Sequence, residues 1–293
     1  MPHATLRAGN LTAVIGDNAG YDGHRAGYNG LHSLAHRAEP TSLFVPGIAG
    51  LNLEHIMDGE KEFRDIDGVR DIFFEPRRAP MQFTQISDRA AELYQPPTPT
   101  FKVKSWTRFT LSAPHYIDFT FRCRATEKVF AHDYLGLFWA SYINAPEDKS
   151  MYLRCDGRWQ QLCTQVHNDE STVVHKHDAE KLAFDARDKN CLFINFSPLR
   201  FDEPLFYGHF RELMFIMMFD LPEPQTLLRF THSPSGGGQN AAAQTSNPAW
   251  DWQFIIPNVE VGHEYAYRAR TVYRPRCSRE EILAEYQRWK RAL

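Results

Sequence analysis

The chain has 293 residues, of which 43% are hydrophobic and 13% aromatic, so it can bury a large core and is not a disordered chain. Its 33 basic and 36 acidic side chains give a net charge of −3, which argues against nucleic acid or anionic lipid as a main partner. No secretory leader is evident, and the longest apolar run, 213–221, is too short to span a bilayer. The five cysteines include no CxxC pair, so we expect free thiols. Together with the missing leader and the short apolar run, this leads us to expect a cytoplasmic protein without a membrane partner.

Most predicted elements are short strands between Gly, Pro, Asn and Asp residues. The proline-rich residues 90–100 predict a long loop. Residues 116–123 and 264–270 alternate apolar with polar side chains, as half-buried strands do. Residues 135–143 are apolar almost throughout, which is typical of a central strand between two packed layers. Residues 250–256 alternate Trp, Trp, Phe and Ile with Asp, Gln and Ile.

A helical pattern appears at the C-terminus, after a second predicted long loop at 233–248. Ser278 and Glu281 match a capping box, which satisfies free backbone N–H groups at a helix start. An apolar stripe at helical spacing follows: Ile282, Tyr286, Trp289 and Leu293. The sequence therefore predicts an all-β protein, a single domain over residues 1–293, with a short amphipathic helix at 278–293 packed on it.

Three segments resemble the galactose mutarotase-like group. They are LTAVI at 11–15 with HRAGYNGL at 24–31, LGLFWASYI at 135–143, and NPAWDW at 247–252 with the strand at 265–270. The resemblance implies a large antiparallel β-supersandwich and, more broadly, a protein that handles carbohydrate. We identify no counterpart of the late Glu-x-Gln segment that carries the mutarotases' general base, so no catalytic residue is carried over.

The stretch LNLEH at 51–55 is the most suggestive for chemistry. Asn52 and Glu54 share one face of a predicted strand, and His55 opens a turn that ends at 58–59. A Glu–His pair beside small residues can exchange protons with a ligand. An ordinary strand end with a solvated glutamate fits the pattern equally well.

Two further polar groups are candidates. Arg77 and Arg78 follow an aromatic run and could bind a carboxylate or paired sugar hydroxyls, although a surface ion pair is the alternative. His115 and Asp118 could form an acid–base pair if the strand entry bends His115 toward the face of Asp118, since a regular strand would point them to opposite faces.

Tyr207 and His209 alternate onto one side of a predicted strand, where they could face a sugar or merely form the polar face of an edge strand. Trp139 and Trp250 are candidate stacking platforms, or ordinary core residues. His175 and His177 form the HxH motif of the chain, a weak metal candidate without an assigned carboxylate ligand. We expect no cofactor.

The sequence favours a carbohydrate-active enzyme of epimerase, lyase or hydrolase type. His55, His115 or His209 would move a proton, with Glu54 as a catalytic carboxylate and Asn52, Arg77, Arg78, Asp118, Trp139, Tyr207 and Trp250 as substrate-binding residues. The alternative is a non-catalytic carbohydrate-binding or assembly module. A metal-dependent enzyme that uses His175 and His177 is a third possibility.

Overall fold

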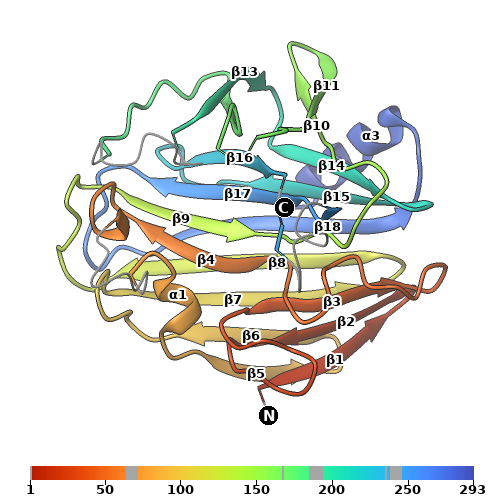
Figure 1. Cartoon of the computed structure of the whole chain (residues 1–293), viewed down its shortest axis with the longest axis horizontal. Helices are drawn as coiled ribbons and strands as arrows, with labels where there is room; N and C mark the ends of the chain where they lie inside the picture. The colour runs from red at the N-terminus through yellow and green to blue at the C-terminus, as the bar shows by residue number, and fades with distance from the viewer. Residues whose placement is uncertain (1, 64–71, 167, 185–193, 235, 238–245) are drawn as a thin grey trace.

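Alternating apolar side chains let the strands of this chain assemble into stacked sheets. The structure is a computed structural model, and it describes residues 2–63, 72–166, 168–184, 194–234, 236–237 and 246–293. Two large sheets face each other, and a small sheet lies beside them (Figure 1). The small sheet has the order β1 (His3–Ala8), β2 (Leu11–Gly16) and β3 (Gly30–His36).

The largest sheet has nine strands, and all its neighbouring pairs are antiparallel. Its order is β11 (Arg158–Leu162), β10 (Met151–Cys155), β14 (Leu205–Phe210), β15 (Leu213–Asp220), β18 (Tyr265–Pro275), β8 (Tyr116–Ala125), β7 (Val103–Ser112), β6 (Ala90–Gln95) and β5 (Gln82–Ser87). Strand β8 buries alternate residues, which confirms the half-buried strand predicted at 116–123.

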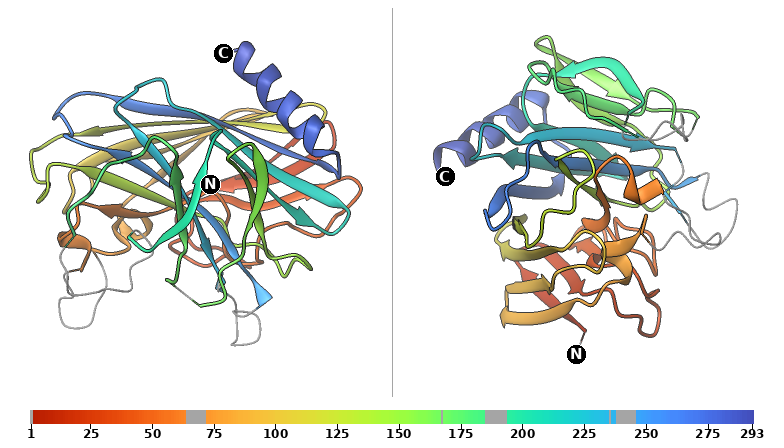
Figure 2. Two further views of the ribbon diagram at one scale, coloured as in Figure 1. Left: turned by 90° about the horizontal axis from the view of Figure 1, so that it is seen from above. Right: turned by 90° about the vertical axis from the view of Figure 1, so that its left-hand side faces the viewer.

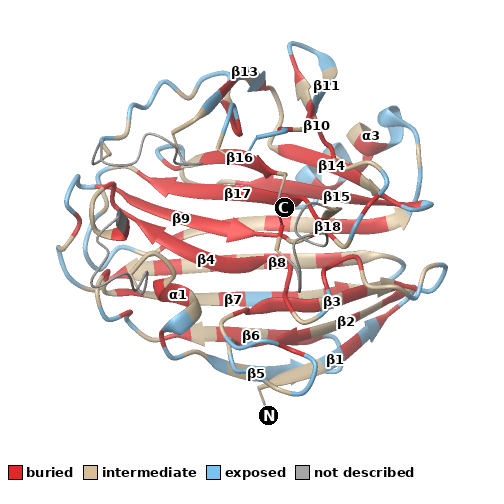
Figure 3. Ribbon diagram, viewed as in Figure 1, coloured by how far each residue is buried: buried red, intermediate tan, exposed pale blue. Residues whose placement is uncertain are grey.

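The second sheet has six strands, paired antiparallel except for β12 with β13. Its order is β13 (Phe196–Phe201), β12 (Thr172–His175), β16 (Leu227–Ser233), β17 (Ala249–Ile256), β9 (Leu135–Ala140) and β4 (Asn52–Met57). Strands β4, β9 and β17 are buried at every position, so both of their faces are covered (Figure 3). This confirms the prediction of a central strand at the start of 135–143.

Aromatic side chains fill the space between the two large sheets. Phe119 on β8 meets Trp139 on β9 edge to face, with ring centroids 5.1 Å apart. Trp139 in turn stacks on Trp252 of β17, at 5.6 Å and nearly parallel. Trp139 and Trp250 are both fully buried in this core. The structure therefore does not place either indole where a sugar ring could stack on it.

Two helices lie on opposite sides of the molecule (Figure 2). The single-turn helix α1 (Glu75–Arg78) packs on β4, and α3 (Arg279–Arg291) packs on β15. A short 3-10 helix, η1 (Lys61–Phe63), follows β4. The capping box predicted at the start of α3 is confirmed. The predicted stripe is one residue too long, because α3 ends before Leu293 and that side chain is exposed.

The loop predicted at 90–100 is wrong in its first half. Residues 90–95 form β6 instead, because alternate side chains such as Leu93 are buried and the backbone pairs with β7. Much of the loop predicted at 233–248 lies outside the described residues. Cys191 lies outside the described residues. The four described cysteines are free: Cys123, Cys155, Cys163 and Cys277. Among the described residues, no helix combines the length and apolar character needed to cross a membrane.

We expect Trp139→Ala to lower the free energy of unfolding by about 3–5 kcal/mol, because it leaves a cavity between the two large sheets. Trp106 on β7 is only partly buried and serves as the matched control, with a smaller loss for Trp106→Ala. Urea unfolding followed by circular dichroism measures both values. Equal losses in the two variants would contradict the placement of Trp139 in the core.

Candidate active site

A β-bulge brings Glu54 and His55 to the same side of β4. The pairing of β4 with β9 shifts register between Leu53 and His55, so Glu54 is an extra residue without a partner on β9. In a regular strand, the neighbouring side chains would point to opposite faces. Here, instead, Glu54 Oε2 lies 3.2 Å from His55 Nε2. His55 thus belongs to the strand, and the turn predicted at this residue does not begin there.

Glu54 is the centre of a buried polar group that we call the Glu54 group: Glu54, His55, Arg77 and Tyr142. Arg77 Nη1 donates to Glu54 Oε1 over 2.8 Å, and the Tyr142 hydroxyl donates to the same oxygen. His55 Nδ1 also lies 2.5 Å from the Phe73 carbonyl oxygen. Both imidazole nitrogens therefore face acceptors, one of them a carboxylate.

Helix α1 positions Arg77, and two other segments hold α1 in place. The buried carboxylate of Glu75 accepts hydrogen bonds from the backbone N–H groups of Thr100 and Phe101. Asn18 Nδ2 donates to the carbonyls of Arg77 and Ala79, over 3.1 and 2.7 Å. A helix of one turn has little stability of its own, so these side chains fix where Arg77 lies.

The guanidinium of Arg77 is enclosed by aromatic rings. It lies 3.7 Å from the ring centroid of Tyr28 and 4.8 Å from that of Phe74. Its Nε donates to the Gly27 carbonyl over 2.8 Å. Arg77 therefore joins the loop at 17–29 to Glu54 on β4.

The surroundings of Glu54 keep it ionised. Burial alone would raise the pKa of this carboxyl group, but His55, Arg77 and the Tyr142 hydroxyl lower its pKa to about 2. At Arg77, burial lowers the pKa, but Glu54 together with Tyr142 and Tyr28 outweighs it and the net pKa is raised. Burial together with Glu54 raises the pKa of Tyr142. Because the folded pKa of Glu54 is depressed, its stabilising effect is present above about pH 4.5 and is lost toward pH 2.

A second carboxyl group, Asp251, lies on the other side of β9. Asp251 Oδ1 accepts a hydrogen bond of 2.9 Å from the Ser141 backbone N–H. Burial, with a smaller contribution from the charge of Glu54, raises the pKa of Asp251 well above its usual range. Our sequence analysis missed this residue, although Asp251 and Gln253 stand out as polar positions in an otherwise apolar strand. Together they form an Asp-x-Gln segment late in the chain.

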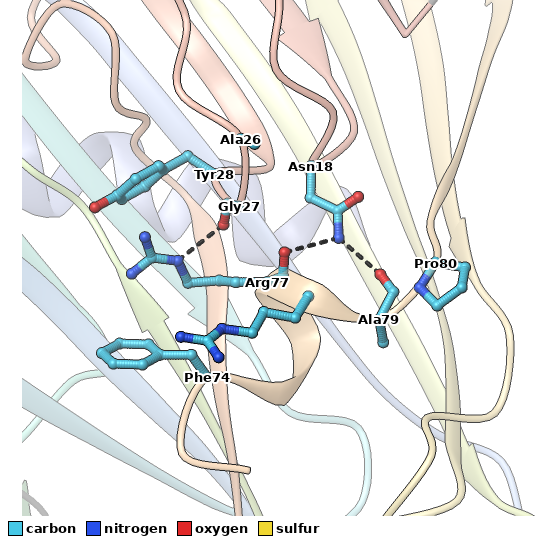
Figure 4. A pocket seen from close by; sticks show the side chains of 9 residues that line it. Asn18, Ala26, Gly27, Tyr28, Phe74, Arg77, Ala79 and Pro80 are labelled. Carbon is cyan, nitrogen blue, oxygen red and sulfur yellow. Dashed lines mark hydrogen bonds between the residues drawn. The ribbon is translucent and has the colours of Figure 1, made fainter. Parts of the chain in front are cut away.

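A pocket of about 680 Å³ opens beside Arg77 (Figure 4). Its walls come from the loop at 17–29 and from the segment around α1: Asn18, Ala26, Gly27, Tyr28, Phe74, Arg77, Arg78, Ala79 and Pro80. Figure 4 shows the Arg77 guanidinium between the rings of Tyr28 and Phe74. Arg77 thus belongs both to the pocket wall and to the Glu54 group.

The structure places the other predicted residues of the nine-stranded sheet outside this group. Asp118 on β8 pairs with Arg270 through two hydrogen bonds of 2.7 and 3.0 Å, so the predicted His115–Asp118 pair does not form. Tyr207 on β14 accepts a hydrogen bond from Arg279 of α3. The ring of His209 packs edge to face against the ring of Tyr207, beside the same helix.

Asn52 and the HxH motif also have local partners. Asn52 is fully buried, and its Oδ1 accepts a hydrogen bond from the Asn29 backbone N–H, which fastens the end of the loop at 17–29 to β4. Strand β12 ends at His175, so His177 lies beyond it and the two imidazoles do not share a strand face. Within the described residues, no three His, Cys, Asp or Glu side chains gather as metal ligands would.

Stacked rings support the pocket wall formed by the loop at 17–29. His24 and His32 stack with centroids 3.5 Å apart, and Tyr21 stacks on His3 at 3.8 Å. His24 Nε2 lies 2.8 Å from the Tyr28 carbonyl oxygen, so the stack reaches the residue that covers Arg77. Burial lowers the pKa of His24, and it lowers the pKa of His32 to about 3.

No family model matches the chain, and no curated protein sequence matches it. Among solved structures, a putative aldose 1-epimerase from Escherichia coli K12 is 10% identical over 94% of this chain and 99% of that chain, with a TM-score of 0.50. This chain has the galactose mutarotase-like supersandwich fold. The resemblance stated from the sequence is confirmed at the level of fold, and 10% identity carries nothing further.

Two other structures are similar at TM-scores of 0.48. An aldose epimerase homologue from C. elegans is 9% identical over 93% of this chain and 99% of that chain. A heparan sulfate lyase from Pedobacter heparinus is 10% identical over 94% of this chain. This chain spans 36% of the lyase, about a third of its length.

We expect acid to destabilise the protein through its buried neutral histidines. The folded pKa of His32, about 3, lies below the unfolded value of about 6.5. Between these two pH values the unfolded chain binds a proton at His32 and the folded chain does not, which favours unfolding. This group has no effect above pH 7 and costs about 2 kcal/mol of stability at pH 5. Urea unfolding at pH 7.5 and 5.0 measures the loss. The variant His32→Gln, even if less stable at pH 7.5, should lose less on acidification. An unchanged acid loss in that variant would contradict the assignment.

Proposed function

We propose that this chain is a carbohydrate-active enzyme that acts on a sugar or sugar acid by acid–base chemistry of a histidine and carboxyl groups. The observation that carries the proposal is the Glu54 group: an ionised carboxylate, an adjacent imidazole and an arginine shared with a pocket. Buried charges are costly, and groups with strongly shifted pKa values concentrate at functional sites. The name of the similar structure with a TM-score of 0.50, a putative aldose 1-epimerase, agrees with sugar as the substrate class.

Two carboxyl groups with opposite proton preferences give the site both an acid and a base. Glu54 stays ionised and can accept a proton, whereas burial raises the pKa of Asp251 well above its usual range and so favours the protonated form, which can donate one. Their strands, β4 and β17, flank β9 on either side, so the backbones lie about 10 Å apart at the usual strand spacing.

Within this arrangement, His55 and Glu54 exchange the proton, while Arg77 and Tyr142 keep the carboxylate in place. Proton transfer at the anomeric hydroxyl describes an epimerase, and proton removal at C5 of a sugar acid describes a lyase. Protonation of a glycosidic oxygen describes a hydrolase. Each of these reactions uses groups that donate and accept protons next to a sugar ring.

A second candidate function, a non-catalytic carbohydrate-binding module, has two observations in its favour. Both oxygens of Glu54 already have partners, and its side chain is only 7% exposed. The pocket borders Arg77 rather than the carboxylate itself. A binding module needs the pocket but no proton transfer.

The variant Glu54→Gln distinguishes the two candidate functions, the enzyme and the binding module. We expect the wild-type protein to convert one sugar class in a screen that follows anomer exchange, unsaturated product and new reducing ends by NMR. Glu54→Gln keeps the shape but removes the charge, and we expect it to lose at least about a hundredfold in turnover. Because Arg77 would lose its ion-pair partner, thermal unfolding and ligand affinity must be measured on the same sample.

Glu92→Gln is the matched control, because Glu92 also pairs with an arginine, Arg108, but on the exposed face of the nine-stranded sheet. That variant should retain full turnover. Sugar binding without conversion of any substrate by the wild-type protein would favour the binding module. Full turnover in a folded Glu54→Gln variant would remove the proposed role of Glu54.

A further inference from the structure

Two stacked histidines lie beneath the loop at 17–29, which forms one wall of the pocket. His24 belongs to this loop and His32 to β3, and their rings lie 3.5 Å apart, 18° from parallel. Both residues are buried, with 7% and 4% of their surface exposed. The hydrogen-bond partners of the His32 ring, the Asp17 carbonyl and the Tyr21 hydroxyl, come from the same loop. His32 therefore keeps these contacts while the loop is closed.

The contacts of the pair fit two neutral rings. Nε2 of His32 lies 3.1 Å from the Asp17 carbonyl oxygen, so this nitrogen carries a hydrogen. Its Nδ1 lies 3.1 Å from the Tyr21 hydroxyl oxygen and accepts a hydrogen bond from it. A proton on Nδ1 would remove this acceptor, and protonation of both histidines would place two positive charges face to face. Burial, more than any other cause, lowers the pKa of both rings.

The titratable and charged groups around the pair offer little compensation for such a charge. His3 on β1 is another imidazole, with its ring centroid 6.4 Å from that of His32. Asp17 is acidic, but its carboxylate already accepts a backbone hydrogen bond, and burial raises the pKa of this group. Asp22 and Arg25, farther along the loop, are exposed. Protonated rings would therefore be more stable in water than beneath the closed loop.

The same loop connects the histidine pair with the pocket. Nε2 of His24 lies 2.8 Å from the carbonyl oxygen of Tyr28, whose ring centroid lies 3.7 Å from the Arg77 guanidinium. The Gly27 carbonyl accepts a hydrogen bond from Arg77 Nε. Arg77 and Arg78, the charged groups that line the pocket on this side, are both cations. A movement of His24 away from His32 would thus carry the wall residues of the pocket with it.

We propose that the His24–His32 pair is a pH latch on the pocket. While both rings are neutral, their stacking holds the loop at 17–29 against Arg77. In acid, the rings take up protons and release the loop, which opens one wall of the pocket. This inference does not depend on the proposed function, because it concerns the pocket wall and not the reaction.

The size of the effect follows from proton uptake by the open loop. With the loop open, His32 has its ordinary pKa of about 6.5, whereas with the loop closed its pKa is about 3. A lowered pKa in the closed form favours opening as the pH falls below 6.5. His32 alone should therefore raise the population of the open loop about thirtyfold between pH 7.5 and pH 5.0. His24, whose pKa is also lowered, adds to this change.

Hydrogen exchange of the native protein, followed by NMR, tests the latch. The backbone N–H groups of His24, Arg25 and Gly27 make the hydrogen bonds that close the loop, so their exchange reports on its opening. Amides of β17 report on unfolding of the whole molecule, since this strand is buried at every position. Protection is compared at pH 7.5 and 5.0, with and without low urea, after correction for the intrinsic pH dependence of exchange.

We expect the loop amides to exchange faster than those of β17 at both pH values. Their protection should fall about thirtyfold or more at pH 5.0 and should not respond to low urea, because a local opening exposes little surface.

His32→Gln and His24→Phe are the test variants. The first removes a proton-binding ring, and the second keeps a ring for stacking that cannot be protonated. His32→Gln should reduce the acid loss of loop protection about tenfold or more, and His24→Phe should also reduce it. His263→Gln is the matched control, because His263 is an exposed histidine paired with Glu223, and this variant should show the full acid loss.

Loop protection that is equal at pH 7.5 and 5.0 would overturn the inference, and this wild-type comparison decides the question even where a variant does not fold. Loop and β17 amides that lose protection together, with the same response to urea, would also overturn it. In that case the histidines would take up protons only when the whole molecule unfolds. An acid loss in His32→Gln as large as in the wild-type protein would exclude His32 from the latch.

Discussion

The charge on Glu54 is buried, and the structure around it is arranged to compensate that charge. Arg77 comes from α1, Tyr142 from the strand end after β9, and His55 from the same bulge as Glu54 itself. A carboxylate buried here without partners would cost several kcal/mol of folding free energy, so the native structure needs these partners in place. The interaction therefore joins two separate segments, α1 and the end of β9, to β4. It also sets the position of the guanidinium that forms one wall of the pocket.

The loop at 17–29 contacts Arg77, the partner of Glu54, and so depends on the same ion pair. Tyr28 and Gly27 contact Arg77, Asn18 binds the carbonyls of α1, and the stacked rings of His24 and His32 support the loop from beneath. The pocket thus lies between a strand bulge and a loop that share one arginine. A change in either element is therefore expected to move the wall of the pocket.

Much of the fold could be predicted from side-chain periodicity. Alternation at 116–123, continuous apolarity at 135–143 and the capping box at Ser278 each correspond to an element of the structure. The site could be predicted only in part. The Glu54–His55 pair and Arg77 were identified as separate candidates, but the bulge that brings Glu54 and His55 to one side of β4, and the contact of Arg77 with Glu54, are marked by no sequence pattern. Asp251 was missed because the analysis of its strand considered only the tryptophans as functional candidates.

The sequence by itself determined the class of fold, the C-terminal helix and the supply of charged residues near turns, because these follow from local spacing and composition. Only the tertiary structure decided which polar residues meet. It paired Asp118 with Arg270 on the outer face of the nine-stranded sheet, and it paired Glu54 with Arg77 across 23 residues. It also buried Trp139 and Trp250 between the two large sheets. The physical reason is that strand order and register set which faces are covered, and both depend on contacts between residues far apart in the chain.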